Sequence, residues 1–177
     1  MNVIVRHMII VFLLLLAALP LRAQTKDTLQ MKEIYLENDL VYRQSNDERF
    51  SGVVQHKRKN GHLVYEEVYE DGIIREAYEY YNGKGKFLYR KTLYQSYKLW
   101  VLEKEFIYGK SKKDWSQINS YNEKGQKILE EGFENEKLVY RCEYLGKKKH
   151  GQEFCYTDEG DVLIQEYIHG KKVRKKK

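Results

Sequence analysis

The chain has 177 residues, of which 42% are hydrophobic, 14% aromatic and 33% charged, and its mean hydropathy is -0.74. These values suit one soluble domain and argue against a multi-span membrane protein. The formal net charge is +6, but eight of the 32 basic residues lie in residues 1–23 and 171–177, which leaves 24 basic against 26 acidic residues elsewhere. A mildly acidic body lacks the basic face of a nucleic-acid-binding protein, so no nucleic-acid partner is expected.

Residues 1–23 have the pattern of a secretory signal peptide. Arg6 and His7 precede an apolar stretch from Met8 to Leu19, and the small residue Ala23 stands at a plausible cleavage point. The alternative is an uncleaved anchor, but an uninterrupted apolar run of about a dozen residues is short against the roughly 20 that span a bilayer. We therefore expect export, with cleavage near Ala23 and a periplasmic or secreted mature protein.

The next segment, residues 24–38, is expected to be extended, with Ile34–Leu36 as its first strand. Beyond it, turn signals recur every 11 residues, at Asn60-Gly61, Asp71-Gly72 and Asn82-Gly83. Such dipeptides favour type I′ hairpin turns, because both turn residues need a positive φ. Alternating polar and apolar residues between these turns, over 63–69 and 73–80, predict strands.

The rhythm weakens over residues 85–115. Aromatic and aliphatic residues over Phe87–Tyr94 and Leu99–Tyr108 predict two longer strands, followed by a loop from Gly109 to Asp114. A helix over Lys91–Glu105 is the competing interpretation.

In the C-terminal half, an aromatic residue closes each expected strand at intervals of 12, 11, 12 and 11 residues. These aromatics are Tyr121, Phe133, Tyr144, Tyr156 and Tyr167. The pattern predicts an all-β fold, an elongated antiparallel meander of stacked β-hairpins with two strands in each repeat of about 23 residues. We expect charged residues on one face of this sheet and tyrosines on the other.

Several short units resemble bacterial MORN-repeat variants. The units are Phe50–Val54, Asn60–Leu63, Tyr69–Gly72, Gly146–Gly151, Tyr156–Gly160 and Tyr167–Gly170. The resemblance covers residues 39–173, except for the irregular stretch 85–115. It implies a single-layer sheet of stacked hairpins and a binding or scaffold role. No cofactor is expected. The antitoxin label of some bacterial relatives adds an antitoxin or immunity protein as an alternative.

Two groups of residues are candidates for binding. The aromatic residues Trp100, Trp115, Tyr94, Tyr97 and Tyr108, with Phe106 beside them, form a candidate surface for a partner or a sugar. Alternatively, they fill the buried face of the sheet. The basic tail carries Lys171, Lys172, Arg174, Lys175, Lys176 and Lys177, with residues 174–177 beyond the repeats. It is a candidate contact for anionic lipid or polysaccharide, or else a solubilising end.

The cysteines and histidines give weaker signals. Cys142 and Cys155 are candidates for a disulfide in an oxidising compartment, but the repeat spacing places them on opposite faces, so a bulge is needed to bring them together. The histidines of the repeats are expected at turns and apart from one another, and no metal site is expected. They are His56, His62, His150 and His169.

No catalytic constellation, phosphate-binding loop or nucleophile motif was found. The sequence therefore predicts an exported non-enzymatic β-repeat protein that binds a protein partner in the bacterial envelope. The alternatives are a carbohydrate-binding module, which requires Trp100 and Trp115 exposed on one flat patch, an antitoxin or immunity protein, and a hydrolase with two carboxylates facing each other across a cleft.

Overall fold

The computed structural model describes residues 27–83, 85–96, 99–110, 115–157 and 159–174, and the signal-peptide prediction lies outside them. The elements are β1 (Thr28–Gln30), the 3₁₀ turn η1 (Met31–Glu33), β2 (Ile34–Glu37), β3 (Leu40–Arg43), β4 (Gly52–Lys57), β5 (Leu63–Glu70), β6 (Ile73–Tyr80), β7 (Leu88–Tyr94), β8 (Leu102–Tyr108), β9 (Trp115–Tyr121), β10 (Lys127–Glu134), β11 (Lys137–Leu145), β12 (Lys148–Tyr156), β13 (Val162–Ile168) and β14 (Lys171–Lys172).

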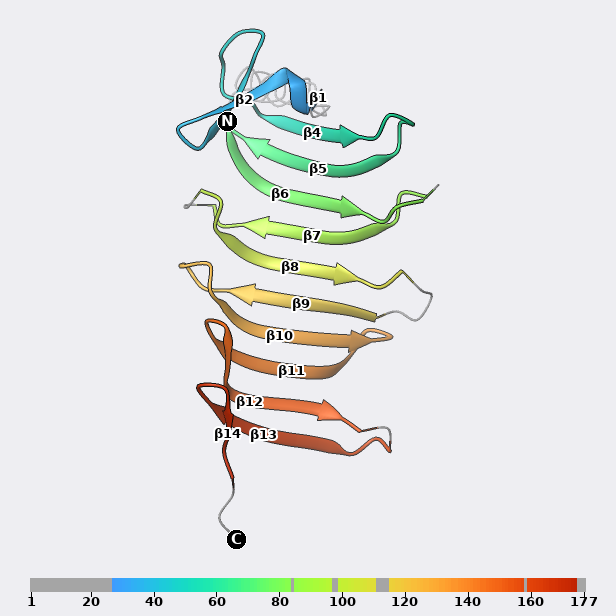
Figure 1. Cartoon of the computed structure of the whole chain (residues 1–177), viewed down its shortest axis with the longest axis vertical. Coiled ribbons are helices and arrows are strands. Elements are labelled where there is room, and N and C mark those ends of the chain that lie inside the picture. The colour runs from blue at the N-terminus through green and yellow to red at the C-terminus, as the bar shows by residue number, and fades with distance from the viewer. Residues whose placement is uncertain (1–26, 84, 97–98, 111–114, 158, 175–177) are drawn as a thin grey trace, which may run out of the picture.

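Strands β4 to β14 follow one another as a single antiparallel meander. With β1 they form one open sheet of 12 strands, in which chain order and spatial order agree from β4 onward (Figure 1). The predicted all-β meander is therefore confirmed. One pairing departs from it, because β1 lies parallel to β4 at the N-terminal edge.

The stretch 85–115 continues the meander. β7 pairs with β6, and β8 pairs with both β7 and β9, so both predicted strands form and the alternative helix over 91–105 does not. The buried Gln95 ties the loop between β7 and β8, because its side-chain amide donates to the carbonyls of Leu102 and Asn122. Each of these strands is hydrogen-bonded to a neighbouring strand on both sides, and this pairing outweighs the local preference for a helix.

The turn chemistry is more varied than the dipeptides predict. Of the three turn dipeptides, only Asp71-Gly72 has positive φ at both residues, 51° and 76°. Asn60 and Asn82 have no positive φ, so their turns are not type I′, since the loops that contain them are longer than two residues. A two-residue turn with both φ positive also occurs at Asn135-Glu136, which carries no glycine.

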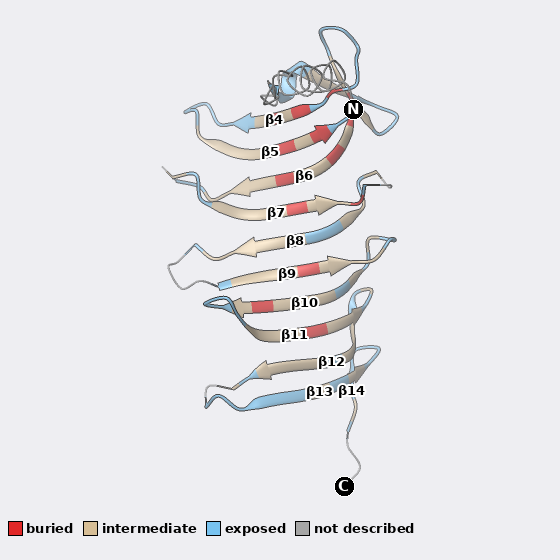
Figure 2. Ribbon diagram, turned by 180° about the vertical axis from the view of Figure 1, so that it is seen from behind, coloured by how far each residue is buried: buried red, intermediate tan, exposed pale blue. Residues whose placement is uncertain are grey.

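One face of the sheet carries most of the buried side chains; we call it the ladder face. The pairing register aligns one residue from each strand across its middle: Val54, Glu67, Ala77, Thr92, Glu105, Asn119, Glu130, Cys142, Glu153 and Gln165. Buried positions recur on the strands from β4 to β11, except β8, and are absent from β12 and β13 (Figure 2).

The apolar core lies at the N-terminal end of the ladder face. Phe50, Val54, Tyr69 and Ile74 form a cluster with Val41 of β3, and the partly buried Leu29, Ile34 and Tyr94 pack against it. The hairpin β2–β3 thus covers this end of the sheet. Toward the C-terminus, no second layer covers the ladder face among the described residues (Figure 1).

Tyrosines and carboxylates share the ladder face, contrary to the predicted separation of charge and tyrosine. Tyr69 donates its hydroxyl hydrogen bond to Glu67, and Tyr144 donates to Glu130 at 3.1 Å. Tyr121 donates to Glu105 in the same way. The prediction failed because residues two apart along a strand share a face, so a tyrosine two positions from a carboxylate, as Tyr69 is from Glu67, lies on the same side of the sheet.

Candidate functional site

A cleft opens on the face opposite the ladder face, which we call the cleft face. Residues Tyr108, Ser116 and Phe133 stand directly opposite one another on β8, β9 and β10. Neighbouring strands lie about 4.8 Å apart, so the two aromatic side chains are separated by roughly twice that distance. The small side chain of Ser116 between them leaves a slot.

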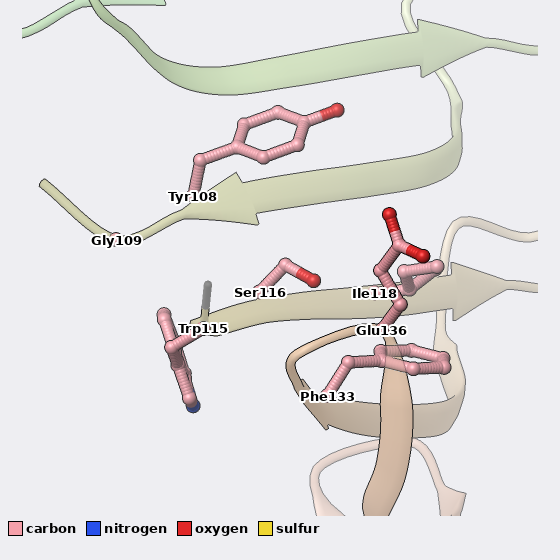
Figure 3. Close-up of a pocket in the computed structure, with 7 residues that line it drawn as sticks. All are labelled: Tyr108, Gly109, Trp115, Ser116, Ile118, Phe133 and Glu136. Atoms are coloured by element: carbon pink, nitrogen blue, oxygen red, sulfur yellow. The ribbon is translucent and has the colours of Figure 1, made fainter. Parts of the chain in front are cut away.

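The slot is part of a cavity of about 470 Å³ lined by Tyr108, Gly109, Trp115, Ser116, Ile118, Phe133 and Glu136 (Figure 3). Ile118 adds an apolar wall, because it lies two residues along β9 from Ser116 and so points to the same face. Glu136 supplies a carboxylate from the turn between β10 and β11, where its φ is 64°. The lining of the cavity therefore combines apolar walls with the hydroxyls of Ser116 and Tyr108 and the carboxylate of Glu136.

Hydrogen bonds to backbone carbonyls fix the positions of Tyr108 and Trp115 at the cleft. The hydroxyl of Tyr81 donates to the carbonyl of Tyr108 at 2.7 Å, and the backbone N–H of Gly109 donates to the carbonyl of Trp115 at 3.0 Å. A side chain at Gly109 would stand 3.6 Å from the Trp115 ring, so the indole lies beside the backbone at the end of the slot. The cleft is thus built on paired strands and not on a free loop.

The ladder face has a different chemistry, because its carboxylates are already engaged. Burial raises the pKa of Glu153, but hydrogen bonds from Lys149, Tyr167 and Tyr140 outweigh burial and lower the pKa below its ordinary value. Burial also raises the pKa of Glu67, and there the hydrogen bonds from Tyr69 and Tyr65 do not compensate, so the net shift is upward. Burial and its carboxylate neighbour likewise raise the pKa of Tyr121. Glu153 and Glu67 are therefore both held by hydrogen bonds within the ladder face.

The predicted aromatic surface is split between two places. Tyr108 and Trp115 line the cleft, whereas Tyr94 and Trp100 contact each other at the other edge of the sheet, with ring centroids 6.3 Å apart. Trp100 lies in the loop before β8 and Trp115 beyond its end, so the whole of β8 separates them. Tyr97 lies outside the described residues, and Phe106 is in the middle of β8 on the cleft face.

The two tryptophans therefore do not share one flat patch, although both are exposed, to 38% and 40%. The indole N–H of Trp100 donates to the carbonyl of Asp39 at 3.1 Å, which links the loop between β7 and β8 to the hairpin β2–β3. Trp100 therefore has a structural role. The juxtaposition that the carbohydrate alternative required is absent.

The two cysteines share a face, contrary to the parity argument. Cys142 stands opposite Glu153 and Cys155 opposite Tyr140, so the thiols are diagonal neighbours on the ladder face. Both are free in this structure, Cys142 buried and Cys155 partly exposed. The parity argument failed because it took Tyr144 and Tyr156 to face the same way, whereas the pairing of Cys142 with Glu153 and of Tyr140 with Cys155 places these two tyrosines on opposite faces.

Two of the four histidines meet, which the sequence analysis did not expect. The rings of His150 and His169 are 5.0 Å apart, because β12 begins and β13 ends at the same edge of the sheet. No group of three or more metal-ligating side chains is found among the described residues.

The basic tail begins in ordered structure. Lys171 and Lys172 form β14 and pair with Ile168 and Tyr167, and Arg174 follows at the surface. Lys175, Lys176 and Lys177 lie outside the described residues. In the part of the chain that the structure describes, no helix is long and apolar enough to cross a membrane.

Four residues of the cleft, Ser116, Ile118, Phe133 and Glu136, were not singled out as site residues from the sequence. Phe133 was noted only as a repeat aromatic. Its spacing of 12 residues from Tyr121 does not fix its face, because the facing across a turn depends on the pairing register of the two strands. The alignment of Ser116 between two aromatics depends on register and was not readable from spacing.

Comparison of the chain with protein-family models, curated proteins and solved structures found no match.

Proposed function

We propose that the protein is an exported, non-enzymatic β-repeat module of the bacterial envelope that binds a protein partner through the cleft face. The observation that supports this proposal is the cleft itself: an apolar slot between Tyr108 and Phe133, open to solvent and floored by Ser116. A slot of this width takes one aromatic or branched aliphatic side chain, and such inserted side chains provide much of the binding energy of protein interfaces.

The charge at the cleft indicates which residue stands next to the inserted side chain. Glu136 is exposed at the turn, so its carboxylate favours a Lys or Arg on the partner beside the apolar anchor. A protein partner is preferred to a polysaccharide because the two exposed tryptophans lie at opposite edges of the sheet. Sugar binding by aromatic stacking needs a platform, whereas this site is a narrow slot.

The experiment is to fill the slot without removing any aromatic residue. Tagged wild-type protein is used to capture proteins from envelope extract of the same organism at high salt, and the captured protein is identified by mass spectrometry and purified. Binding of that protein is then measured by calorimetry for wild type, Ser116→Leu and Ser120→Leu. Ser120 lies on the same strand and face but outside the cleft, so it is the matched control.

We expect Ser116→Leu to weaken binding at least about tenfold, because the leucine occupies the space of the anchor, and Ser120→Leu to bind as wild type. A captured protein whose affinity is unchanged by Ser116→Leu, or equally reduced by both variants, would contradict binding through the cleft. If the wild-type protein captures no protein and binds only anionic material that high salt releases, the proposal is wrong and the basic tail is the binding element.

A further inference from the structure

The outer edge of β13 is open along most of its length. β13 pairs with β12 on one side, but on the other side only Tyr167 and Ile168 pair with β14. Among the described residues no strand covers the outer edge of residues 162–165 (Figure 1).

The direction of the free backbone groups follows from one hydrogen bond. The carbonyl of Glu166 accepts from the N–H of Val173, which lies on the outer side of β13. In an antiparallel strand the N–H and C=O of a residue point to the same side, and successive residues alternate. Ile164 and Val162 therefore present their N–H and C=O groups outward, and a further strand can bond to all four.

The side chains at this edge are apolar. Val162, Leu163 and Ile164 are 48%, 58% and 66% exposed, and no charged residue lies within 162–165. Soluble proteins usually protect such an edge with charges, proline or a covering segment, because an exposed apolar edge strand recruits another strand. In the part of the chain that the structure describes, none of these protections occurs between Val162 and Gln165.

The edge is complementary to itself. An antiparallel pairing centred on Leu163 places Val162 opposite Ile164 of the second copy and the two copies of Leu163 opposite each other. It also places Asp161 opposite Gln165, so no like charges meet. The pairing stops before Glu166, whose carbonyl is already engaged by Val173. At the other end of the sheet, the edge that the structure describes is only the three residues of β1.

From this geometry we propose that two copies of the chain associate through their β13 edges, so that the two sheets join antiparallel about a two-fold axis at Leu163. Because both copies use the same edge, the association closes at a dimer and does not propagate. The contact is short, so the interface belongs to the small class and the dimer depends on concentration. This association does not involve the cleft.

The test is sedimentation velocity on the purified protein over a range of concentrations. We expect wild type to shift from monomer to dimer as concentration rises. Leu163→Lys and Leu163→Glu should each self-associate at least about tenfold more weakly, because like charges then face each other across the axis. An equimolar mixture of these two variants should dimerise again. The matched control is Leu36→Lys, because Leu36 is 59% exposed but lies in β2 at the other end of the molecule.

Three results would overturn the proposal. If wild type stays monomeric at every concentration, the β13 edge does not pair with a second copy, and a strand from another protein is then its partner. If Leu163→Lys does not weaken the wild-type dimer, the dimer interface lies elsewhere on the molecule. A mixture of the Lys and Glu variants that remains monomeric excludes pairing centred on Leu163. Leu163 is mostly exposed, so neither substitution removes buried packing from the fold.

Discussion

At the scale of single residues, the carboxylates of the ladder face divide into two kinds by their surroundings. Glu153 contacts Lys149 and accepts from Tyr140 at 3.1 Å, so its ionised form is stabilised. Glu67 is almost fully buried and receives only neutral tyrosine hydroxyls, so its ionised form is penalised. Two glutamates aligned across the ladder face therefore make the stability of the protein depend on pH in opposite directions.

Glu153→Gln should destabilise the protein at neutral pH by roughly 1.5–3 kcal/mol, the range for hydrogen bonds to charged groups. The pKa of Glu153 is lowered by folding, so its stabilisation is present above the pKa of the unfolded chain and is lost as the pH falls through the lower folded pKa. Urea unfolding from pH 7 to pH 3 should show the two proteins converging at the acidic end. A difference independent of pH would contradict this account.

Glu67→Gln should show the reverse trend. The pKa of Glu67 is raised by folding, so its contribution is favourable below the pKa of the unfolded chain and is lost as the pH rises through the folded pKa. The free energy of unfolding of Glu67→Gln relative to wild type should therefore increase from pH 4 to pH 7 in the same titration. The opposite slope would mean that the tyrosine hydrogen bonds outweigh burial.

At the scale of elements, the turn between β5 and β6 connects the sheet to the N-terminal segment. The N–H of Gly72 donates to the carbonyl of Phe50, and the carbonyl of Gly72 accepts from Val41, both within 2.9 Å. A Cβ at Gly72 would stand 2.9 Å from the Val41 carbonyl oxygen. Glycine is required here by both its φ and this close approach.

Gly72→Ala should cost more stability than Gly61→Ala, and thermal unfolding of both variants measures the difference. The two glycines have similar φ values, 76° and 80°, so each substitution costs roughly 1–2 kcal/mol of backbone strain. Only Gly72 meets another backbone, because no atom lies within 4 Å of a Cβ at Gly61. Equal losses would show that the N-terminal segment shifts freely and does not depend on this contact.

At the scale of the whole molecule, burial is distributed unevenly along the sheet. The core cluster packs on β4 to β6, whereas β13 has no buried residue and five of its seven residues are exposed. In a linear array each hairpin contacts only its neighbours, so local stability follows local burial. Hydrogen exchange at a concentration low enough to dissociate the proposed dimer should show the slowest exchange in β5 and β6 and the fastest in β12 and β13. Uniform protection would contradict this gradient and indicate one cooperative unit.

The sequence by itself was sufficient for the fold class. Strand alternation, turn dipeptides and the aromatic spacing of 11 and 12 residues predicted the meander, because these are local signals with a direct stereochemical cause. The two strands in the irregular stretch were also predicted. The export and the MORN resemblance remain predictions.

Only the tertiary structure decided which residues share a face and which lie side by side. The pairing register of β11 and β12 placed Cys142 and Cys155 on one face, and the formation of β8 between Trp100 and Trp115 separated the two tryptophans by the length of that strand. The slot over Ser116 exists because three strands align in one register. Spacing along one strand cannot determine such alignments, because a shift of a single residue moves every later side chain to the other face.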